Sequence, residues 1–399
     1  MQFGFRKGHS TDQALMSFIS KIIQAMETGE YTIGVFLDLS KAFDTIHHRI
    51  LLRKLETYGI RGVPLQWFES YLQNRKQFVT YNGVSSYERT LLCGVPQGSV
   101  LGPLLFLIYV NDLYRAVPSL FCVLFADDTN VLMSDSDLDN LVSKLNADLE
   151  KLDIWFKVNK LSINLKKTKF MIFTNKKYLL KPKIEINSCE IEQVSDLKFL
   201  GIVLDDKLNW KSHIAYVSNK LAKSISILYK VRYILSSEMR KILYSAFVTP
   251  HIAYCNIVWG STYRSNLKAL MILQKKAVKL ALGLPLLHPF IQLFHTASIL
   301  SFSNINLLQV SMFMYRFHND MLPSFFKRFF TYNSDIHQHN LRNLHNFALP
   351  PTRTNYMKFS IQYHGPIVWN ALPKELKSLN SIQMFKSRCK KYLMEENLN

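Results

Sequence analysis

Three aspartates follow apolar segments of the chain, and together they could bind divalent cations. Asp127 and Asp128 are adjacent and lie between two apolar, strand-forming segments, and Asp38 ends a third such segment. Adjacent anions repel each other, so neither can be buried without a compensating cation. Clustered carboxylate oxygens suit Mg²⁺, and a pair of such ions can activate a hydroxyl and stabilise a departing pyrophosphate. A solvated Asp-Asp turn is the alternative interpretation of Asp127 and Asp128.

A shared β-sheet is the arrangement that would bring these carboxylates together. Residues 31–39 form a β-rich apolar run typical of a buried strand, and 120–125 and 129–133 indicate two strands joined across the Asp-Asp pair. If the three strands share one sheet, their ends converge and the carboxylates form a cluster.

Helices and a hairpin are expected around these strands. Apolar residues recur at helical spacing from Phe43 to Tyr58, and again along one face of 135–156. Between them, Asn82-Gly83 predicts the turn of a β-hairpin. The second half of the chain is mainly helical in pattern, so we expect a boundary near residue 210 between an α+β part and a helical part.

The bulk composition is that of a basic globular protein. The 399 residues are 48% apolar and 20% charged, and 49 lysines and arginines against 29 acidic residues give a formal charge of +20. Such an excess favours a polyanionic partner such as nucleic acid, although a generic basic surface gives the same count.

Cysteine usage and hydropathy bear on location. The five cysteines include no Cys-x-x-Cys pair, which argues against a zinc site and a disulfide framework and fits a reducing compartment. The first residues contain no apolar signal core, and the longest apolar stretch, 100–110, is about half of what a bilayer needs. We therefore expect an intracellular protein of the nucleus, the cytoplasm or both, neither secreted nor bound to a membrane.

Six sequence blocks, in order along the first half of the chain, resemble the motifs of non-LTR retrotransposon reverse transcriptases. They are 2–11 (QFGFRKGHST), similar to a fingers motif, 36–44 (FLDLSKAFD), similar to motif A, 94–106 (GVPQGSVLGPLLF), similar to motif B, 125–129 (FADDT), similar to motif C, 164–169 (NLKKTK), similar to motif D, and 197–202 (LKFLGI), similar to the primer grip. Ordered blocks are far more specific than a lone Asp-Asp pair. The Jockey-like branch is the most similar, and a looser block at 365–373 resembles the end of such a reading frame.

The resemblance implies an α+β fold, the right-hand polymerase with an antiparallel sheet in its palm. The implied regions are partial fingers over 1–30, the reverse transcriptase palm with finger elements over 31–210, a helical thumb over 211–285 and a C-terminal extension over 286–399. The implied enzyme is an RNA-directed DNA polymerase, a nucleotidyltransferase that adds dNTPs to a primer 3′-hydroxyl on an RNA template. Two Mg²⁺ ions, with Mn²⁺ as an alternative, are the implied cofactors. Template RNA, DNA primer and dNTPs are the implied partners.

The same resemblance assigns catalytic and metal-binding roles. Asp38 and Asp127 would bridge the metal pair, Leu39 would offer its backbone carbonyl to one ion, and Asp128 would complete the cluster. Lys167 occupies the position of a lysine that would protonate the departing pyrophosphate. Its lysine neighbours could equally be phosphate contacts or solvated side chains.

Three residues are expected at the nucleotide. Phe43 matches the position of a bulky gate beneath the incoming sugar, where a ring would clash with a 2′-hydroxyl and favour deoxynucleotides. A core phenylalanine is the alternative. Gln97 would contact template or nucleotide through its amide, and Gly98 would let the backbone approach the nucleotide closely. Without the resemblance, these two residues are a tight turn before a helix.

Basic residues in both halves are expected to contact nucleic acid. Arg6 and Lys7 lie in the fingers block and could contact template or triphosphate, and Lys220 and Lys223 lie in the predicted thumb, where they would hold phosphates. Solvated helix faces and ordinary surface residues would look the same in sequence.

The sequence also departs from the pattern of such elements. It starts inside the fingers, and it shows no upstream finger motif, endonuclease, RNase H or Cys/His knuckle, so we interpret it as amino-terminally truncated and do not expect target-primed integration by this chain alone. A nucleic-acid-binding remnant that no longer polymerises is the competing hypothesis. An organellar intron maturase is a third, which the motif B block and the block at 365–373 disfavour.

Overall fold

The chain folds into two compact units. The computed structural model describes residues 1–177, 181–285, 293–336 and 345–395. One unit comprises Met1–Ala14 and Gly29–Val194, and the other comprises Leu15–Thr28 and Ser195–Asn399. This division precedes the predicted boundary near 210, and it puts the predicted thumb and C-terminal extension in the same unit. No helix within the described ranges is long and apolar enough to cross a bilayer.

The first unit combines a sheet with helices. Its strands are β1 (Tyr31–Leu37), β2 (Lys76–Gln77), β3 (Thr80–Tyr81), β4 (Val84–Ser85), β5 (Arg89–Thr90), β6 (Phe121–Phe125), β7 (Asp128–Asp135), β8 (Lys169–Phe173), β9 (Glu185–Ile186), β10 (Cys189–Glu190) and β11 (Glu192–Gln193). Its helices are α2 (His48–Thr57), α3 (Val63–Leu72), α4 (Leu101–Val110), α5 (Leu113–Ala116), α6 (Leu138–Val158) and the first residues of α1 (Thr11–Thr28).

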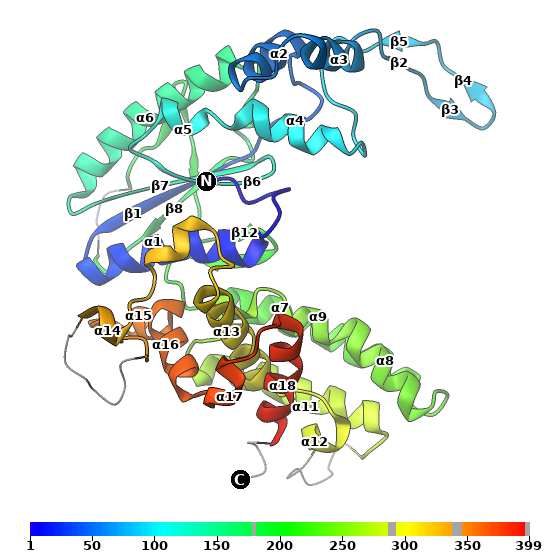
Figure 1. Cartoon of the computed structure of the whole chain (residues 1–399), viewed down its shortest axis with the longest axis vertical. Helices are drawn as coiled ribbons and strands as arrows, with labels where there is room; N and C mark the ends of the chain where they lie inside the picture. The colour runs from blue at the N-terminus through cyan, green and yellow to red at the C-terminus, as the bar shows by residue number, and fades with distance from the viewer. Residues whose placement is uncertain (178–180, 286–292, 337–344, 396–399) are drawn as a thin grey trace. The chain divides into compact units, whose positions relative to one another are not determined.

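Five strands form the main sheet in the order β11-β8-β1-β7-β6, with β1 at the centre (Figure 1). β1 is antiparallel to β7 and to β8, and β6 is antiparallel to β7, whereas the short β11 runs parallel to β8. Successive side chains alternate between the faces of a strand, so Ile33, Val35 and Leu37 share one face. They are buried in a common core with Leu105 of α4 and Leu145 of α6. The predicted α+β fold with an antiparallel sheet is confirmed, with one parallel pairing at its edge.

The helix predicted from Phe43 begins later than the sequence periodicity indicates, at His48. The carbonyl oxygens of Phe43 and Ile46 accept hydrogen bonds from the backbone amides of Val95 (3.0 Å) and Gly94 (2.8 Å). Because a helix needs those carbonyls for its own i to i+4 bonds, this segment forms turns instead. The prediction of its start was wrong because the competing partner lies about fifty residues further along the chain.

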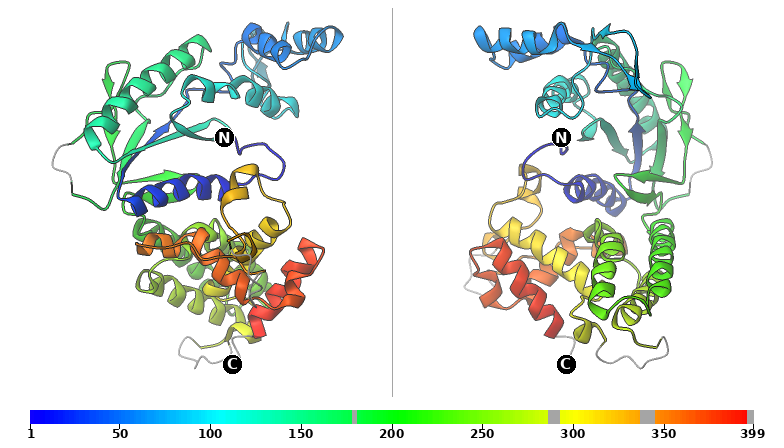
Figure 2. Two further views of the ribbon diagram at one scale, coloured as in Figure 1. Left: turned by 60° about the vertical axis from the view of Figure 1, so that its left-hand side comes forward. Right: turned by 90° about the vertical axis from the view of Figure 1, so that its right-hand side faces the viewer.

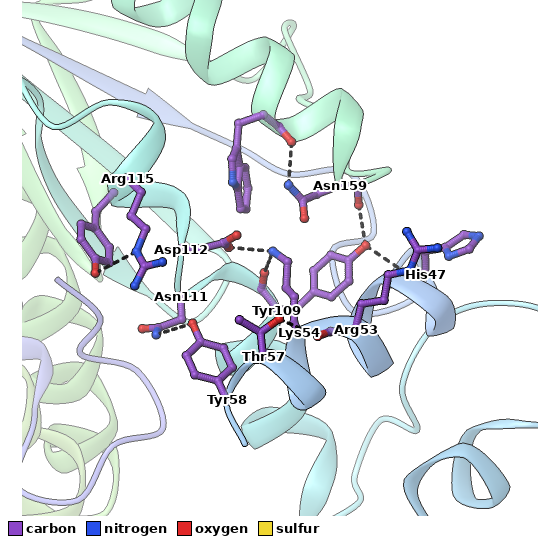
Figure 3. Close-up of polar contacts among 12 residues, drawn as sticks. His47, Arg53, Lys54, Thr57, Tyr58, Tyr109, Asn111, Asp112, Arg115 and Asn159 are labelled. Carbon is purple, nitrogen blue, oxygen red and sulfur yellow. Dashed lines mark hydrogen bonds and ion pairs between the residues drawn. The ribbon is translucent and has the colours of Figure 1, made fainter. Parts of the chain in front are cut away.

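A polar network ties α2 to α4 and to the end of α6 (Figure 3). The Lys54 ammonium donates to the Asp112 carboxylate (2.6 Å) and to the Tyr109 carbonyl (2.5 Å). The Tyr109 hydroxyl donates to the Asn159 carbonyl (2.6 Å) and accepts from the His47 amide (3.3 Å). Burial lowers the pKa of Lys54, and the hydrogen bond that Lys54 donates to Asp112 opposes that shift. The network fixes the start of α2 against the helical layer.

An exposed two-stranded arm extends from the first unit between α3 and α4 (Figure 1). β2 pairs with β5, and β3 pairs with β4 across the predicted turn. The turn residues Asn82 and Gly83 both have positive φ, at 47° and 79°, as a type I′ turn requires. The predicted hairpin is confirmed.

The second unit is mainly helical. It contains Leu15–Thr28 of α1. Its other described elements are β12 (Asp196–Phe199), β13 (Ile202–Asp205), α7 (Lys211–Lys230), α8 (Ser237–Phe247), α9 (Thr249–Ala253), α10 (Asn256–Trp259), α11 (Arg264–Leu282), α12 (Leu293–Ala297), α13 (Phe302–His318), the 3₁₀ helix Ser324–Arg328, α14 (Asn333–Ile336), α15 (Asn355–Phe359), α16 (Ile361–Ala371), α17 (Lys374–Lys377) and α18 (Ile382–Glu395). The yellow α13 packs beside the red α18 in the right-hand view of Figure 2. Tyr315 of α13 stacks on Phe385 of α18 with 4.4 Å between ring centroids, so these helices share an aromatic core.

Candidate active site

The sheet brings the three predicted aspartates to one edge. In the antiparallel β1–β7 register, Leu37 lies opposite Thr129. The next pair toward the sheet edge is therefore Asp38, which comes after Leu37, and Asp128, which comes before Thr129. Phe125 pairs with Asp128, which leaves Ala126 and Asp127 as the two residues of the β6–β7 turn. The strand ends therefore converge as the sequence predicts.

The carboxylates also interact electrostatically. Desolvation of its carboxyl group, together with the negative charges of Asp127 and Asp38, raises the pKa of Asp128 to about 6. Asp128 as a residue is solvent-exposed, as is Asp127, and Asp38 is half-buried. The negative charges of the neighbouring carboxylates act in the same direction as desolvation, and a bound cation would relieve both.

The side chains do not form a complete coordination shell by themselves. Among the described residues, no group of three or more histidine, cysteine or acidic side chains is arranged so that it could hold a metal ion. Mg²⁺ is commonly held by one or two carboxylates, with waters and substrate phosphates as the other ligands. The oxygen donors of Asp38, Asp127 and Asp128 fit that mode of binding, because they are hard ligands that lie partly open to solvent.

The predicted motif D segment is fastened to the backbone around Asp38. The Asp38 carbonyl accepts from the Asn164 amide (2.8 Å), and the Asp38 amide donates to the Thr168 hydroxyl (3.5 Å). The Lys167 ammonium is 3.6 Å from a carboxylate oxygen of Asp38, although the lysine side chain is 70% exposed. The structure therefore brings Lys167 to the carboxylates while leaving most of its side chain in solvent.

Leu39 lies in a short bridge beside the same carboxylates. It pairs with Ile163, and the bridge hydrogen bonds come from the neighbouring Asp38 carbonyl and Ser40 amide. The Leu39 carbonyl is therefore not used by the bridge, as its predicted role requires.

Phe43 lies between two other aromatic rings. Its ring stacks on Phe106 of α4 with centroids 4.4 Å apart and meets Phe5 edge-on at 6.2 Å. The side chain is half-buried, so packing fixes the ring and leaves part of it accessible.

The loop before α4 carries Gln97 and Gly98, both exposed. The Gln97 amide nitrogen donates to the Asp44 carboxylate (2.8 Å), a bond that sequence reasoning did not anticipate. Gly98 has a φ of 82° with open space around it, so a glycine suits the turn and leaves the backbone approachable. An open pocket of about 560 Å³ adjoins this loop, and it is lined in part by Lys41 and Arg75.

The predicted basic contacts divide between the two units. Arg6 and Lys7 are exposed in the first unit, and an Arg6 guanidinium nitrogen donates to the Gln2 carbonyl (3.3 Å). Lys220 and Lys223 are exposed on α7 in the second unit. Their contact with nucleic acid stays a prediction.

Two polar residues at the site were missed by sequence reasoning. Thr168 is fully buried below Asp38, and Gln2 is buried against the turn that carries Asp127. Both stand inside blocks that resemble known motifs, and a polar residue within such a block was the available signal.

In the first unit, helices pack on one face of an antiparallel sheet, and aspartates cluster where its central strands end. This arrangement is that of the palm of a nucleic-acid polymerase. The family described as "Reverse transcriptase (RNA-dependent DNA polymerase)" matches residues 1–204. The chain belongs to this family.

Curated relatives from mobile elements refine the assignment. The chain is 31% identical over 297 residues to the RNA-directed DNA polymerase from mobile element jockey of Drosophila melanogaster, covering 71% of this chain and 32% of the relative. It is 29% identical over 292 residues to a probable RNA-directed DNA polymerase from transposon X-element of the same species, with the same coverage of 71% and 32%. The predicted similarity to non-LTR, Jockey-like reverse transcriptases is confirmed. The chain spans about a third of the length of these relatives.

A solved structure of telomerase from Candida albicans, in complex with a fragment of telomeric RNA, also overlaps the chain. The overlap covers 80% of this chain and 48% of the telomerase, with 14% identity and a TM-score of 0.37.

Proposed function

We propose that this chain carries the catalytic centre of an RNA-directed DNA polymerase, which adds dNTPs to a primer 3′-hydroxyl on an RNA template. The observation that carries the proposal is the convergence of Asp38, Asp127 and Asp128 at one sheet edge, where desolvation and the charges of Asp127 and Asp38 raise the pKa of Asp128 to about 6. Accumulated negative charge at the end of a rigid sheet is the electrostatic setting that a catalytic divalent cation needs.

Asp38 and Asp127 would hold two Mg²⁺ ions, or Mn²⁺, with the Leu39 carbonyl as a further ligand and Asp128 beside them. Bound there, the ions would supply Lewis acidity to the attacking 3′-hydroxyl and the leaving oxygen. The carboxylates lie at the ends of paired strands and in the turn between two of them, so the strand register fixes their spacing. The protein's contribution is therefore mainly to position the reacting groups.

Lys167 is the proposed proton donor. The 3′-hydroxyl gives its proton to a water molecule as its oxygen forms a bond to the α-phosphorus. The bond from that phosphorus to the pyrophosphate oxygen breaks, and the Lys167 ammonium gives a proton to the pyrophosphate and regains one from solvent. The support is the 3.6 Å approach of Lys167 to Asp38, together with the exposure of the rest of the side chain, which leaves it able to reach a triphosphate.

Phe43 is the proposed gate against ribonucleotides, and Gln97 and Gly98 are proposed to contact the template or the nucleotide. The Phe43 ring is held by Phe106, so it would present a fixed wall to the sugar rather than a movable one. Phe43→Ala should raise the ratio of ribonucleotide to deoxynucleotide incorporation, measured by primer extension with each dNTP or rNTP alone. An unchanged ratio in a variant that still extends with dNTPs would remove Phe43 from this role.

Template and primer are proposed to contact the basic face of α7. The Lys220 ammonium lies 5.6 Å from the Tyr216 ring centroid, and Lys223 is exposed on the same helix. If both contact phosphates, the Lys220→Gln/Lys223→Gln variant should reduce the slope of log affinity against log salt by roughly 1.5 to 2. An unchanged slope would assign these lysines to a solvated helix face.

Primer extension on an RNA template tests the proposed activity. Wild-type chain with Mg²⁺ should extend a DNA primer with dNTPs, and Asp127→Asn should do so about 10³-fold more slowly. Extension that is absent from the wild type, or that is unchanged in Asp127→Asn, would instead support a nucleic-acid-binding remnant.

A further inference from the structure

The first residues of the chain run along the open edge of the sheet. β6 is the last strand in the sheet order, and Gln2 forms a parallel bridge with its residue Leu124. The Phe3 amide donates to the Leu124 carbonyl (2.8 Å), and the Leu124 amide donates to the Met1 carbonyl (2.7 Å). This segment therefore follows β6 up to the turn that carries the catalytic aspartates.

The Gln2 side chain forms hydrogen bonds with both the amide and the carbonyl of one residue in that turn, Ala126. Its amide oxygen accepts from the Ala126 amide (3.1 Å), and its amide nitrogen donates to the Ala126 carbonyl (3.2 Å). The same oxygen accepts from the Gly4 amide (2.8 Å). The partners fix the orientation of the side-chain amide, since a backbone N–H can only donate and a carbonyl can only accept. Gln2 is buried, so water competes little for these bonds.

Ala126 adopts a conformation that an alanine does not favour. Its φ is 55°, in the left-handed region that glycine and asparagine populate more readily. Such a conformation persists when surrounding contacts determine it. The bonds from Gln2 to its amide and its carbonyl are contacts of that kind.

Gly4 allows its own backbone to approach the backbone of Ala126 closely. A Cβ at position 4 would lie 2.2 Å from the Ala126 nitrogen and 3.0 Å from its Cα. No side chain fits there, so a glycine at this position lets the segment lie directly against the turn.

We propose that Gln2 is a positioning residue for catalysis: it holds Ala126 in the left-handed conformation that directs Asp127 and Asp128 toward Asp38. Ala126 immediately precedes Asp127, so the orientation of its peptide sets the direction in which the carboxylates leave the turn. The catalytic consequence rests on the proposed polymerase function, whereas the conformational consequence does not. Gly4 acts in the same assembly by permitting the contact.

Three variants at Gln2 and its partner test the proposal. Gln2→Met keeps the length and loses all three side-chain bonds, and Gln2→Glu keeps an acceptor but loses the donor to the Ala126 carbonyl. Ala126→Gly combined with Gln2→Met allows the left-handed φ at position 126 without the hydrogen bonds from the Gln2 side chain. Gln13→Met is the matched control, because Gln13 is also buried in this part of the chain but accepts instead from the Ser10 amide (3.2 Å).

The first readout is hydrogen exchange of a peptide spanning 125–129, measured by mass spectrometry on the full chain. Exchange of the turn should be at least about tenfold faster in Gln2→Met and unchanged in Gln13→Met. This measurement needs no activity, so it decides the conformational role even if the wild type does not polymerise. Unchanged exchange in Gln2→Met would overturn the proposal.

The second readout separates catalysis from binding. In Gln2→Met, kcat for dNTP addition should fall roughly 10- to 100-fold with little change in KM for primer–template, because misplaced groups slow the chemical step. Gln2→Glu should fall between wild type and Gln2→Met, and Ala126→Gly should restore part of kcat in the Gln2→Met background. An equal loss in Gln13→Met, or no rescue by Ala126→Gly, would show a general folding effect and contradict a positioning role.

Discussion

Two hairpin turns of the first unit have the same length and opposite design. In the exposed arm, β3 and β4 are joined by Asn82-Gly83, whose positive φ values suit their residue types. In the main sheet, β6 and β7 are joined by Ala126-Asp127, and the positive φ falls on an alanine. The first turn needs only its own residues, whereas the second is held from outside by the side chain of Gln2.

The difference shows how a functional turn departs from local preference. The Asn-Gly turn could be recognised from two letters of sequence, because its stability comes from those two residues. At the second turn, the neighbouring aspartates serve the proposed chemistry, and the backbone is fixed by contacts with residues more than a hundred positions away. Departures from local rules are expected at functional sites for this reason.

Changing the charge of one residue should affect primer extension far more at the Ala126-Asp127 turn than at the Asn82-Gly83 turn. Asp127→Asn should reduce primer extension by about 10³-fold, at the upper end of what a single electrostatic group contributes. Asn82→Asp makes the reverse change at the exposed turn and should leave extension unchanged. Steady-state rates on one RNA template measure both, and comparable losses would show that the turns do not differ in function.

The pH dependence of cation binding should also distinguish the turns. A carboxyl group must lose its proton before it ligates a metal, so Mn²⁺ affinity should fall by up to about tenfold per pH unit below the Asp128 pKa of about 6. Asp128→Asn should flatten that dependence, whereas Asn82→Asp should not alter it. Titration with Mn²⁺ followed by electron paramagnetic resonance, from pH 5 to pH 8, is the measurement. A wild-type affinity that is constant over this range would contradict the assignment.

The same pKa has a consequence for stability. Folding raises the pKa of Asp128, so between its ordinary range and about 6 the folded chain binds more protons than the unfolded chain. The contribution of this group to the free energy of unfolding is therefore present at low pH and lost as the pH rises through about 6. The free energy of unfolding, measured with urea, should differ between pH 4.5 and pH 7 by less in Asp128→Asn than in the wild type.

Backbone substitutions should give the smallest effects, with opposite signs. Gly83→Ala forces a left-handed alanine and should lower the free energy of unfolding by about 1 kcal/mol. Ala126→Gly removes such a residue and should raise it by less than about 1 kcal/mol, because glycine also gains freedom in the unfolded chain. Urea midpoints of the two variants are the test, and a loss of stability in Ala126→Gly would mean that the Ala126 conformation is not strained.

Sequence patterns predicted the parts of the molecule that depend on neighbours along the chain. The apolar run at β1, the Asn82-Gly83 turn and the helical face of α6 all appear where expected. Contacts between distant segments were not predictable, because periodicity carries no information about them. The late start of α2, caused by hydrogen bonds from Val95 and Gly94, is one such case.

The candidate site divides in the same way. Asp38, Asp127 and Asp128 were found because ordered motifs name them, and β-sheet register then explains their convergence. Gln2 and Thr168 form hydrogen bonds with the backbone at these aspartates, although they lie more than a hundred positions away in the sequence. Their roles could be seen only once the sheet was assembled.

The segment at the start of the chain has a second consequence, for self-association. The amide and carbonyl groups of an uncovered edge strand can recruit a strand from another molecule. Residues 1–4 occupy the outer side of β6 and take up the backbone groups of Leu124 on that side. A chain without these residues would present β6 as a docking edge, and its tendency to form dimers or larger aggregates would rise with protein concentration.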